Sequence, residues 1–375
     1  MLAPSFFEGA CMKVQLAKKP LAEALGHVER IVPNRSGNPG LNLVRVTATA
    51  GGLLLRGTNM DVDIEASLDV DVAAQGDVAL PAQVLGQVIR ALPGDTVDMH
   101  LDDNELVVAS DHFDTRLQTV DPDNAPTLGF PTEFPTQMDA EALSQAFSHV
   151  RYAAATAEYQ AVFRGVKLEV SAENQGARAV ATDGFRLAYH DLPGASGLPG
   201  DVIVPAKGVD EILKVLNGPE VHIAVGDAQL SVQAGGIKLN VKLMDGTFPD
   251  YRRVIPTAFP VTVSVSAGDL KEAVSRVSVL ADRTANNRVD LFVKDGQLRI
   301  SAEGSFGRGQ ETLDVGQSGT DAEMALAFNA KYLLDALASF SDVVDVRFSG
   351  VTSPTVLGQP NQDHHLAMVV PLRTN

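Results

Sequence analysis

One short stretch, A-T-D-G-F-R-L-A-Y-H at residues 181–190, places an acid, a glycine and an arginine within four positions. Asp183 could serve there as the acid of a hydrolase or transferase. Asp-Gly is equally a common turn dipeptide of β-hairpins, because glycine accepts backbone angles that other residues avoid. Such a turn could also present Phe185 and Arg186 to a partner. The residues alone leave three interpretations open: catalysis, a plain turn and a binding site.

Two further stretches could hold a metal ion, D-V-D-I-E at 61–65 and Q-D-H-H-L-A-M at 362–368. Alternate residues of a strand share a face, so Asp61, Asp63 and Glu65 are expected on one side, a pattern more typical of a solvated acidic face. His364 and His365 are neighbours and would point to opposite faces, which makes them a poor ligand pair. We therefore expect no metal and no cofactor.

Other catalytic signatures are missing from the sequence. It contains no G-x-x-x-x-G-K-[ST], no G-x-S-x-G and no H-E-x-x-H. The single cysteine, Cys11, excludes an internal disulfide and fits a reducing cytoplasm. We expect a protein that is not an enzyme.

The chain shows no sign of membrane targeting. No apolar run approaches the roughly 20 residues of a membrane span, and the start, M-L-A-P-S-F-F-E-G-A-C-M, lacks a basic region of a signal peptide. Regular patterning begins at Met12, so residues 1–11 are expected to be a disordered leader. The expected location is the cytoplasm.

Three segments have helical apolar spacing, at 20–32, 139–153 and 266–281. Their apolar positions are Leu21, Leu25, Val28 and Val32; Leu143, Phe147 and Val150; and Leu270, Val274 and Val277. The pattern predicts three amphipathic helices.

A second set of helices reveals an internal repeat. The stretches A-L-P-A-Q-V-L, V-I-V-P-A-K-G and L-A-F-N-A-K-Y place Pro81, Pro205 and Asn329 at successive intervals of 124 residues. Proline in the first turn and asparagine as a cap are both typical helix starts. The spacing predicts three units of about 124 residues, each with two helices.

Short alternating runs between the helices predict strands with tight turns, among them residues 53–70, 105–110, 162–170, 177–182, 221–226, 229–233, 237–243, 289–295, 297–302, 344–350 and 366–372. Proline-rich linkers are expected at 121–135 and 245–260. The expected fold class is α+β, with two helices packed on antiparallel sheet in each of three domains, at 12–133, 134–258 and 259–375.

Charge is distributed unevenly along the chain. The net charge is −17, which taken whole argues against nucleic acid, since phosphate binding depends on Lys and Arg. The six expected helices sum to +1, so the remainder carries −18. Mixed charge on surface helices would explain this, and so would a mildly basic face opposite an acidic one.

Several longer motifs, T-D-G-F-R-L-A, D-G-T-F-P-D-Y-R-R-V, F-N-A-K-Y-L-L-D-A-L and M-V-V-P-L-R, occur together with the repeat. In their order and spacing, from about Met12 to the C-terminus, the chain resembles the bacterial DNA polymerase III beta subunit family, the sliding clamps. The resemblance implies a non-catalytic processivity factor of DNA-clamp fold that forms a head-to-tail homodimeric ring. Helices would line the ring around double-stranded DNA, held without sequence preference, and sheets would form the outer wall.

The resemblance also implies partner proteins: polymerase catalytic subunits, the clamp loader and other replication and repair proteins with a clamp motif. Their short motif of glutamine and hydrophobic residues would dock in a pocket between the second and third domains. The matching positions are Phe163, Thr182, Gly184, Phe185, Arg186, Leu187, Pro249, Arg253, Val254, Asn329, Tyr332, Pro354, Met368, Val370, Pro371, Leu372 and Arg373. We expect an apolar cleft with Arg186, Arg253, Asn329 and Arg373 as donors at its rim.

The chain departs from the familiar pattern of the family at four places. Phe185 stands where His is familiar, Val370 where Met is, Thr115 where an aromatic residue is, and the tail ends in Arg-Thr-Asn. Expected DNA contacts are Arg35, in a loop, and the weaker assignments Lys18, Lys19, Arg30, Arg90, Arg151, Lys207, Lys214, Arg276, Arg283 and Lys331. Expected dimer contacts are Thr115, Leu117, Val279 and Leu280.

Overall fold

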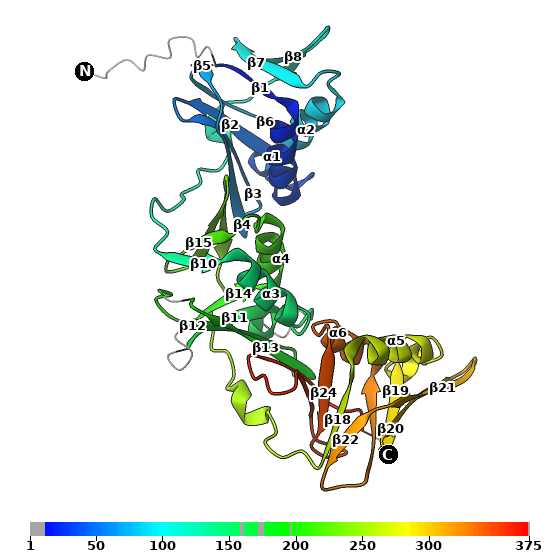
Figure 1. Ribbon diagram of the computed structural model, residues 1–375. Coiled ribbons are helices and arrows are strands. Elements are labelled where there is room, and N and C mark those ends of the chain that lie inside the picture. Colours follow the sequence, from blue (N-terminus) through cyan, green and yellow to red (C-terminus); the bar gives the residue numbers. More distant parts are fainter. Residues whose placement is uncertain (1–11, 158–160, 172–175, 196, 374–375) are drawn as a thin grey trace. The chain divides into compact units, whose positions relative to one another are not determined.

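The computed structural model describes residues 12–157, 161–171, 176–195 and 197–373 (Figure 1). The expected leader at 1–11 lies outside these residues. The described chain contains six α-helices and antiparallel sheets, as predicted. It divides into two compact units, one with the chain up to Ala140 together with residues 214–242, the other with 141–213 and 243 onward.

The first unit holds two sheets. A five-stranded sheet has the order β5-β1-β7-β8-β9, with bounds Val72–Ala74, Lys13–Ala17, Thr96–Asp102, Glu105–Ser110 and Phe113–Gln118. An eight-stranded sheet has the order β10-β15-β16-β17-β4-β3-β2-β6, with bounds Thr136–Asp139, Glu220–Val225, Gln229–Ala234, Ile237–Lys242, Val62–Leu68, Gly52–Thr58, Leu43–Thr49 and Gly76–Pro81.

The second unit also holds two sheets. The larger has the order β14-β11-β12-β13-β26-β25-β24-β18-β22, with bounds Val202–Pro205, Gly165–Ser171, Gly176–Thr182, Arg186–Pro193, His365–Val369, Thr355–Gly358, Val343–Phe348, Val261–Ser266 and Gly316–Gly319. The smaller has the order β21-β20-β19-β23, with bounds Gly307–Asp314, Gln297–Gly304, Arg288–Lys294 and Glu323–Asn329.

Each helix begins directly after a strand, and this strand–helix unit occurs twice in each of the three repeats. The helices are α1 (Lys18–Ile31), α2 (Ala82–Ala91), α3 (Ala140–Arg151), α4 (Ala206–Val215), α5 (Ala267–Ser278) and α6 (Ala330–Leu337). Asn329 caps α6 as predicted, accepting from the backbone N–H of Lys331. Pro81 precedes the first helical residue of α2, one position earlier than expected.

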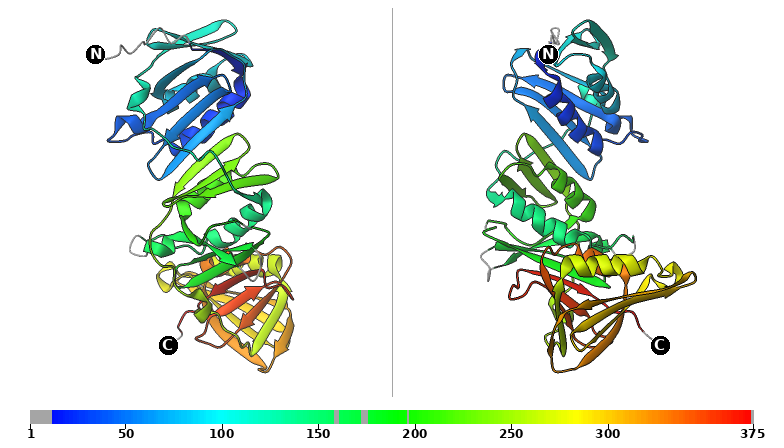
Figure 2. Two further views of the ribbon diagram at one scale, coloured as in Figure 1. Left: turned by 90° about the vertical axis from the view of Figure 1, so that its left-hand side faces the viewer. Right: turned by 45° about the vertical axis from the view of Figure 1, so that its right-hand side comes forward.

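The predicted apolar faces form the cores. Every apolar position expected on the helices is buried, including Leu21, Phe147 and Leu270. In the third repeat, α5 and α6 pack with β18, β19 and β24 around one core, and α5 lies against the yellow-to-orange strands in the right-hand view of Figure 2. None of the described helices is long and apolar enough to cross a membrane.

Two strand pairs cross the expected domain boundaries. β17 pairs with β4 in the first unit, with Leu239 opposite Ile64. β13 pairs with β26 in the second unit, with Leu187 opposite Met368. Backbone pairing between repeats explains why the compact units do not coincide with the three repeats.

Between the elements, the expected linkers contain only short 3-10 helices, η2 (Pro122–Asn124) and η4 (Tyr251–Val254). The remaining 3-10 helices are η1 (Pro39–Asn42), η3 (Ala161–Arg164) and η5 (Arg283–Ala285). The single strand region expected at 53–70 is two strands, β3 and β4, joined by a turn at Met60, whose φ is 76°.

Candidate functional site

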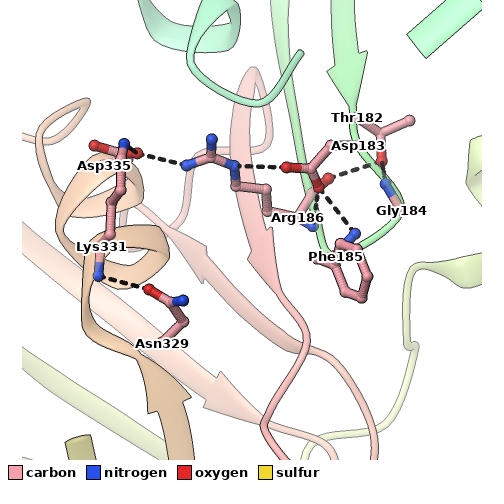
Figure 3. Close-up of polar contacts among 8 residues, drawn as sticks. All are labelled: Thr182, Asp183, Gly184, Phe185, Arg186, Asn329, Lys331 and Asp335. Carbon is pink, nitrogen blue, oxygen red and sulfur yellow. Dashed lines mark hydrogen bonds and ion pairs between the residues drawn. The ribbon is translucent and has the colours of Figure 1, made fainter. Parts of the chain in front are cut away.

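The A-T-D-G-F-R-L stretch forms the hairpin turn between β12 and β13 (Figure 3). The backbone N–H of Asp183 donates to the carbonyl of Arg186 at 3.3 Å, which closes a four-residue turn. Gly184 has φ 87°, and type II′ hairpin turns place glycine at this first central position. Thr182 also stabilises the turn, because its hydroxyl donates to the Arg186 carbonyl at 2.7 Å.

The carboxylate of Asp183 is part of this turn. Its Oδ1 accepts from the backbone N–H groups of Phe185 and Arg186, at 2.9 and 3.0 Å. Its Oδ2 accepts from Nε of Arg186 at 3.1 Å (Figure 3). Both oxygens therefore serve the local structure, and the turn interpretation explains Asp183 without catalysis.

Arg186 lies beneath the turn as a buried cation. Its side chain is 8% exposed and pairs with Asp183 and with Oδ2 of Asp335, the latter at 2.5 Å. The guanidinium also lies over the ring of Tyr332, 4.5 Å from its centroid, an arrangement that stabilises a cation. The charge of Arg186 is therefore matched by two carboxylates inside the protein, and its expected role as a donor at the rim of the peptide pocket stays a prediction.

Phe185 is the exposed residue of the turn. It is 56% exposed, and its ring stacks on Tyr332 with centroids 6.4 Å apart. Its carbonyl accepts from the backbone N–H of Val370 at 2.9 Å, which ties the turn to the C-terminal segment. An exposed aromatic ring held on a second ring offers a preorganised apolar contact.

An apolar cluster continues from the turn along β13 and β26. It contains Leu187 and Met368, which are direct cross-strand partners, together with Phe248 and Tyr251. Leu372 is half-buried, and its backbone N–H donates to the carbonyl of Ala327 at 2.7 Å. Segments far apart in the sequence thus meet at one place.

The remaining expected peptide contacts differ in exposure. Phe163 is half-buried and meets Phe248 edge to face, with centroids 6.5 Å apart. Asn329 and Pro354 are half-buried and Pro371 is buried. Because Asn329 Oδ1 caps α6, its oxygen already has a partner. The exposed residues are Pro249, Arg253, Val254 and Arg373.

Three residues of this region are absent from the expected contacts, although two of them, Asp335 and Tyr251, lie within the quoted motifs. Asp335 balances both Arg186 and Lys331, whose Nζ lies 2.8 Å from Asp335 Oδ2 (Figure 3). The ring of Tyr152 lies 5.5 Å from the Arg186 guanidinium, and burial raises the pKa of this tyrosine. Tyr251 is buried in the apolar cluster. The i, i+4 spacing of Lys331 and Asp335 was the one sequence signal that could have revealed this network.

Many of the expected DNA contacts are engaged within the chain. Lys18 Nζ donates to the carbonyl of Leu92 at the end of α2. The ion pairs are Arg90 with Glu29, Arg151 with Asp210, Arg276 with Glu272 and Glu311, and Lys331 with Asp335. Arg30 Nη2 lies 2.8 Å from Nδ1 of His27. The charges of Arg90, Arg151, Arg276 and Lys331 are therefore balanced by carboxylates of the same chain.

The other expected DNA contacts are exposed. They are Lys19, Arg35, Lys207, Lys214 and Arg283. Apart from Lys214, they form no ion pair within the part of the chain that the structure describes. No ion pair within the described residues therefore balances the charges of Lys19, Arg35, Lys207 and Arg283.

The acidic face expected at D-V-D-I-E is not fully solvated, because one of its three acids is buried. Glu65 is 4% exposed and lies between two cations, Arg56 and Lys238, at 2.6 and 3.1 Å. Asp63 accepts from the hydroxyl of Thr58 at 2.6 Å, and Asp61 lies before β4. Strand neighbours supply the partners of Glu65, so alternation alone did not reveal that this residue is buried, whereas Asp61 is exposed as expected and Asp63 is half-buried.

The expected dimer contacts lie at two sheet edges. Thr115 and Leu117 are half-buried on β9, the last strand of its sheet. Val279, directly after α5, is 82% exposed. Leu280 is half-buried, and its Cδ1 lies close to Gly309 on β21, the edge strand of the four-stranded sheet.

Comparison with known proteins matches the whole described repeat. Family models of the DNA polymerase III beta subunit match at 12–129 (N-terminal domain), 137–250 (central domain) and 252–373 (C-terminal domain). The beta sliding clamp of Caulobacter vibrioides is 30% identical over 380 residues, covering 96% of this chain and 100% of the relative. That of Pseudomonas putida is 29% identical over 371 residues, with 96% and 100% covered.

Solved structures agree with these matches. The sliding clamp of Pseudomonas aeruginosa bound to griselimycin aligns with TM-score 0.91 at 27% identity, covering 97% of this chain and 100% of that one. The sliding clamp of Bacillus subtilis aligns with TM-score 0.91 at 25% identity and the same coverage. The chain therefore belongs to the family of bacterial DNA polymerase III beta subunits, the sliding clamps, which are non-catalytic processivity factors and work with DNA and a DNA polymerase.

Proposed function

We propose that two copies of this chain close head to tail into a ring around duplex DNA in the bacterial cytoplasm. Each copy would contribute three domains, at 12–133, 134–258 and 259–375. In the same proposal, the region around Phe185 binds a linear motif of polymerases, the clamp loader and other replication and repair proteins. The observation that carries it is the three-fold repeat. Its first member contains the edge strand β9, and its third member contains the edge strand β21.

The ring rests on the edge strands β9 and β21. Each is the last strand of its sheet, so one side of its backbone has unused hydrogen-bonding groups. Thr115 and Leu117 lie on β9, and Leu280 packs beside Gly309 of β21. Pairing β9 of one copy with β21 of the other would satisfy both edges and bury Val279. Such a contact joins different surfaces of the two copies, as a closed head-to-tail ring requires.

Sequence-independent DNA binding rests on the exposed cations. Lys19, Arg35, Lys207 and Arg283 are available for phosphates. The paired cations Arg90, Arg151 and Arg276 add positive surface without a net charge. Few free charges give weak contacts, and weak contacts suffice if the ring holds the duplex by enclosing it.

Peptide binding rests on the exposed ring of Phe185 beside an apolar cluster. Leu187, Met368 and Tyr251 pack together beneath the surface. Arg253 and Val254 are exposed on η4, which begins at Tyr251. Apolar anchors with a polar rim are the usual design of a peptide hot spot. In support, a solved clamp of C. crescentus holds polyethylene glycol in a region described as tethering the beta motif.

Ring closure can be tested by light scattering and by DNA loading. A dimer is expected at micromolar concentration, and clamps loaded onto nicked circular DNA should leave once the circle is linearised. A stable monomer, or retention on linear DNA with free ends, would contradict enclosure of the duplex.

The peptide site can be tested with Leu372→Ala and Arg253→Ala. Each variant is expected to weaken binding of a glutamine-containing hydrophobic peptide by about tenfold, equivalent to about 1.4 kcal/mol. Lys294→Ala, on an exposed ion pair with Glu323, serves as the surface control. Loss of the dimer in Leu372→Ala or Arg253→Ala would show that the site is misplaced.

A further inference from the structure

Three histidines from distant parts of the second unit meet on one face of its large sheet. His190 on β13 and His365 on β26 are direct cross-strand partners. His149 comes from the last turn of α3, and its ring lies 4.9 Å from that of His190 and 4.8 Å from that of His365, measured between centroids. Since directly opposed strand residues share a face, the sheet itself fixes two of the three rings side by side.

The three rings are close enough to act on one ion. One nitrogen from each of His149, His190 and His365 lies within 4.8 Å of the others. Nδ1 of His149 and Nδ1 of His190 are 3.2 Å apart. The ring centroid of His365 lies 4.8 Å from that of His149 and 5.1 Å from that of His190.

We propose that His149, His190 and His365 form a binding site for a divalent transition-metal ion, with zinc(II) as its natural occupant. Imidazole nitrogen suits zinc, and three histidines with one open position are a known zinc arrangement. At Zn–N bonds of about 2.0–2.1 Å, tetrahedral ligand atoms lie about 3.4 Å apart. The separation of 3.2 Å between Nδ1 of His149 and Nδ1 of His190 is close to this value, and a nitrogen of His365 lies within 4.8 Å of a nitrogen of each.

The surroundings of His365 prepare it as a ligand. Its Nδ1 lies 2.9 Å from the carbonyl of Tyr189, so this nitrogen carries the proton and donates it. Metal-bound histidines usually make such a bond with the second nitrogen. The free lone pair is then on Nε2, which accepts from the hydroxyl of Ser339 at 2.8 Å. That hydroxyl has a second acceptor, the carbonyl of Ala336 at 2.8 Å, so an ion can displace it cheaply.

The protonation state of the cluster is also suited to a metal. Burial lowers the pKa of His190 to about 4 and that of His365 to about 3, and burial also lowers the pKa of His149. The rings are therefore neutral near pH 7, as metal ligands must be. His149 is only half-buried and His364, whose ring meets that of His190 with centroids 5.7 Å apart, is exposed. The partly exposed His149 gives the ion access from that side, and water can take the fourth position.

A metal here would join two repeats. His149 and His190 come from the second expected repeat and His365 from the third. The ion would hold the β13–β26 pair, whose other end carries Arg186 and Leu187. The site is independent of the proposed ring and peptide contacts.

The decisive experiment is a cobalt(II) and zinc(II) titration of the full chain after treatment with a chelator. Cobalt(II) should give the strong visible absorption of a tetrahedral site, saturate at one ion per chain, and be displaced by zinc(II). His149→Gln, on the partly exposed side, is expected to weaken binding at least about a hundredfold, since even second-shell losses cost 10–100-fold. His190→Gln should do the same. His222→Gln, on β15 of the first unit, is the matched control and should bind like the parent chain.

Thermal unfolding supplies a second measurement. Zinc(II) should raise the unfolding temperature of the parent chain and of His222→Gln, because a ligand of the native state stabilises it, and should leave His149→Gln unchanged. Circular dichroism without metal should show that His149→Gln is folded. If the parent chain binds no ion, or if His149→Gln and His190→Gln bind it as tightly as the parent, the three histidines are a packing cluster and the proposal is wrong.

Discussion

The turn around Arg186 and the helix cations hold their positive charges in opposite ways. Arg186 is 8% exposed, pairs with two carboxylates and lies over an aromatic ring. Arg276 on α5 is 54% exposed and pairs with Glu272 and Glu311 at the surface. A buried pair is costly to break, whereas an exposed pair contributes little and exchanges readily.

This contrast matches the two tasks proposed for the protein. A peptide site gains affinity from parts already fixed before binding, and the buried network fixes Phe185. A surface that slides along DNA needs only weak attraction to phosphate, and exposed pairs such as Arg276 with Glu311 keep the charge that faces the DNA low. The same residue type therefore builds a rigid scaffold in one region and a weakly attractive surface in the other.

Among these variants, Arg186→Ala should cause the largest loss of unfolding free energy. It leaves Asp183 and Asp335 without their buried cation, so the free energy of unfolding should fall by about 3 kcal/mol. Arg253→Ala is the matched control, because that side chain is 84% exposed, and it should change stability by less than about 0.5 kcal/mol. Urea unfolding of both variants measures the difference. Equal losses would show that burial does not distinguish the two arginines.

Gly184→Ala tests the shape of the turn. A non-glycine residue at φ 87° is strained, and we expect a loss of about 1–2 kcal/mol in unfolding free energy. Open space surrounds the added methyl group at both Gly184 and the control position Gly129, where no positive φ is required. Gly129→Ala should therefore be nearly neutral in the same urea experiment. A neutral Gly184→Ala would show that the turn relaxes to another form.

Phe185→Ala tests the exposed half of the turn region. It removes the ring that stacks on Tyr332 while leaving the Arg186 network in place. Peptide affinity should fall about tenfold, with stability unchanged. Phe185→His keeps an aromatic ring and should retain affinity within about threefold. Calorimetric titration with the same peptide measures the affinity of each variant. If Phe185→Ala binds the peptide as tightly as the parent chain, Phe185 is not part of the site.

The smallest effect is expected for single cations facing DNA. Lys207→Ala should lower the slope of log affinity against log salt by about 0.9 for a short duplex, since one phosphate contact is lost. Arg90→Ala should change it less, because that cation is paired with Glu29. Fluorescence anisotropy at several salt concentrations compares them. Equal slopes in both variants would mean that pairing does not control access to DNA.

Much of the fold follows from local sequence rules. The apolar spacing at Leu21, Phe147 and Leu270 predicted helices that are there, and their predicted faces are buried. The 124-residue interval from Pro205 to Asn329 predicted the repeat. These signals are local because a helix is formed by residues three and four positions apart. The Asp-Gly pair likewise predicted the turn, since φ above zero is a requirement of one residue.

What the sequence could not reveal is which distant residues become partners. It suggested a solvated Glu65, but Arg56 and Lys238 on neighbouring strands cover it. It suggested Arg186 as a donor at the rim of a pocket, but did not show that Asp335, 149 positions away, pairs with it. Adjacent positions make His364 and His365 a poor ligand pair, and no sequence pattern links His365 to His149 and His190, which strand register and helix packing bring to it. Composition and spacing determined the elements and their repetition. Tertiary structure alone decided where charges and imidazoles meet, because register and packing join residues that no local pattern relates.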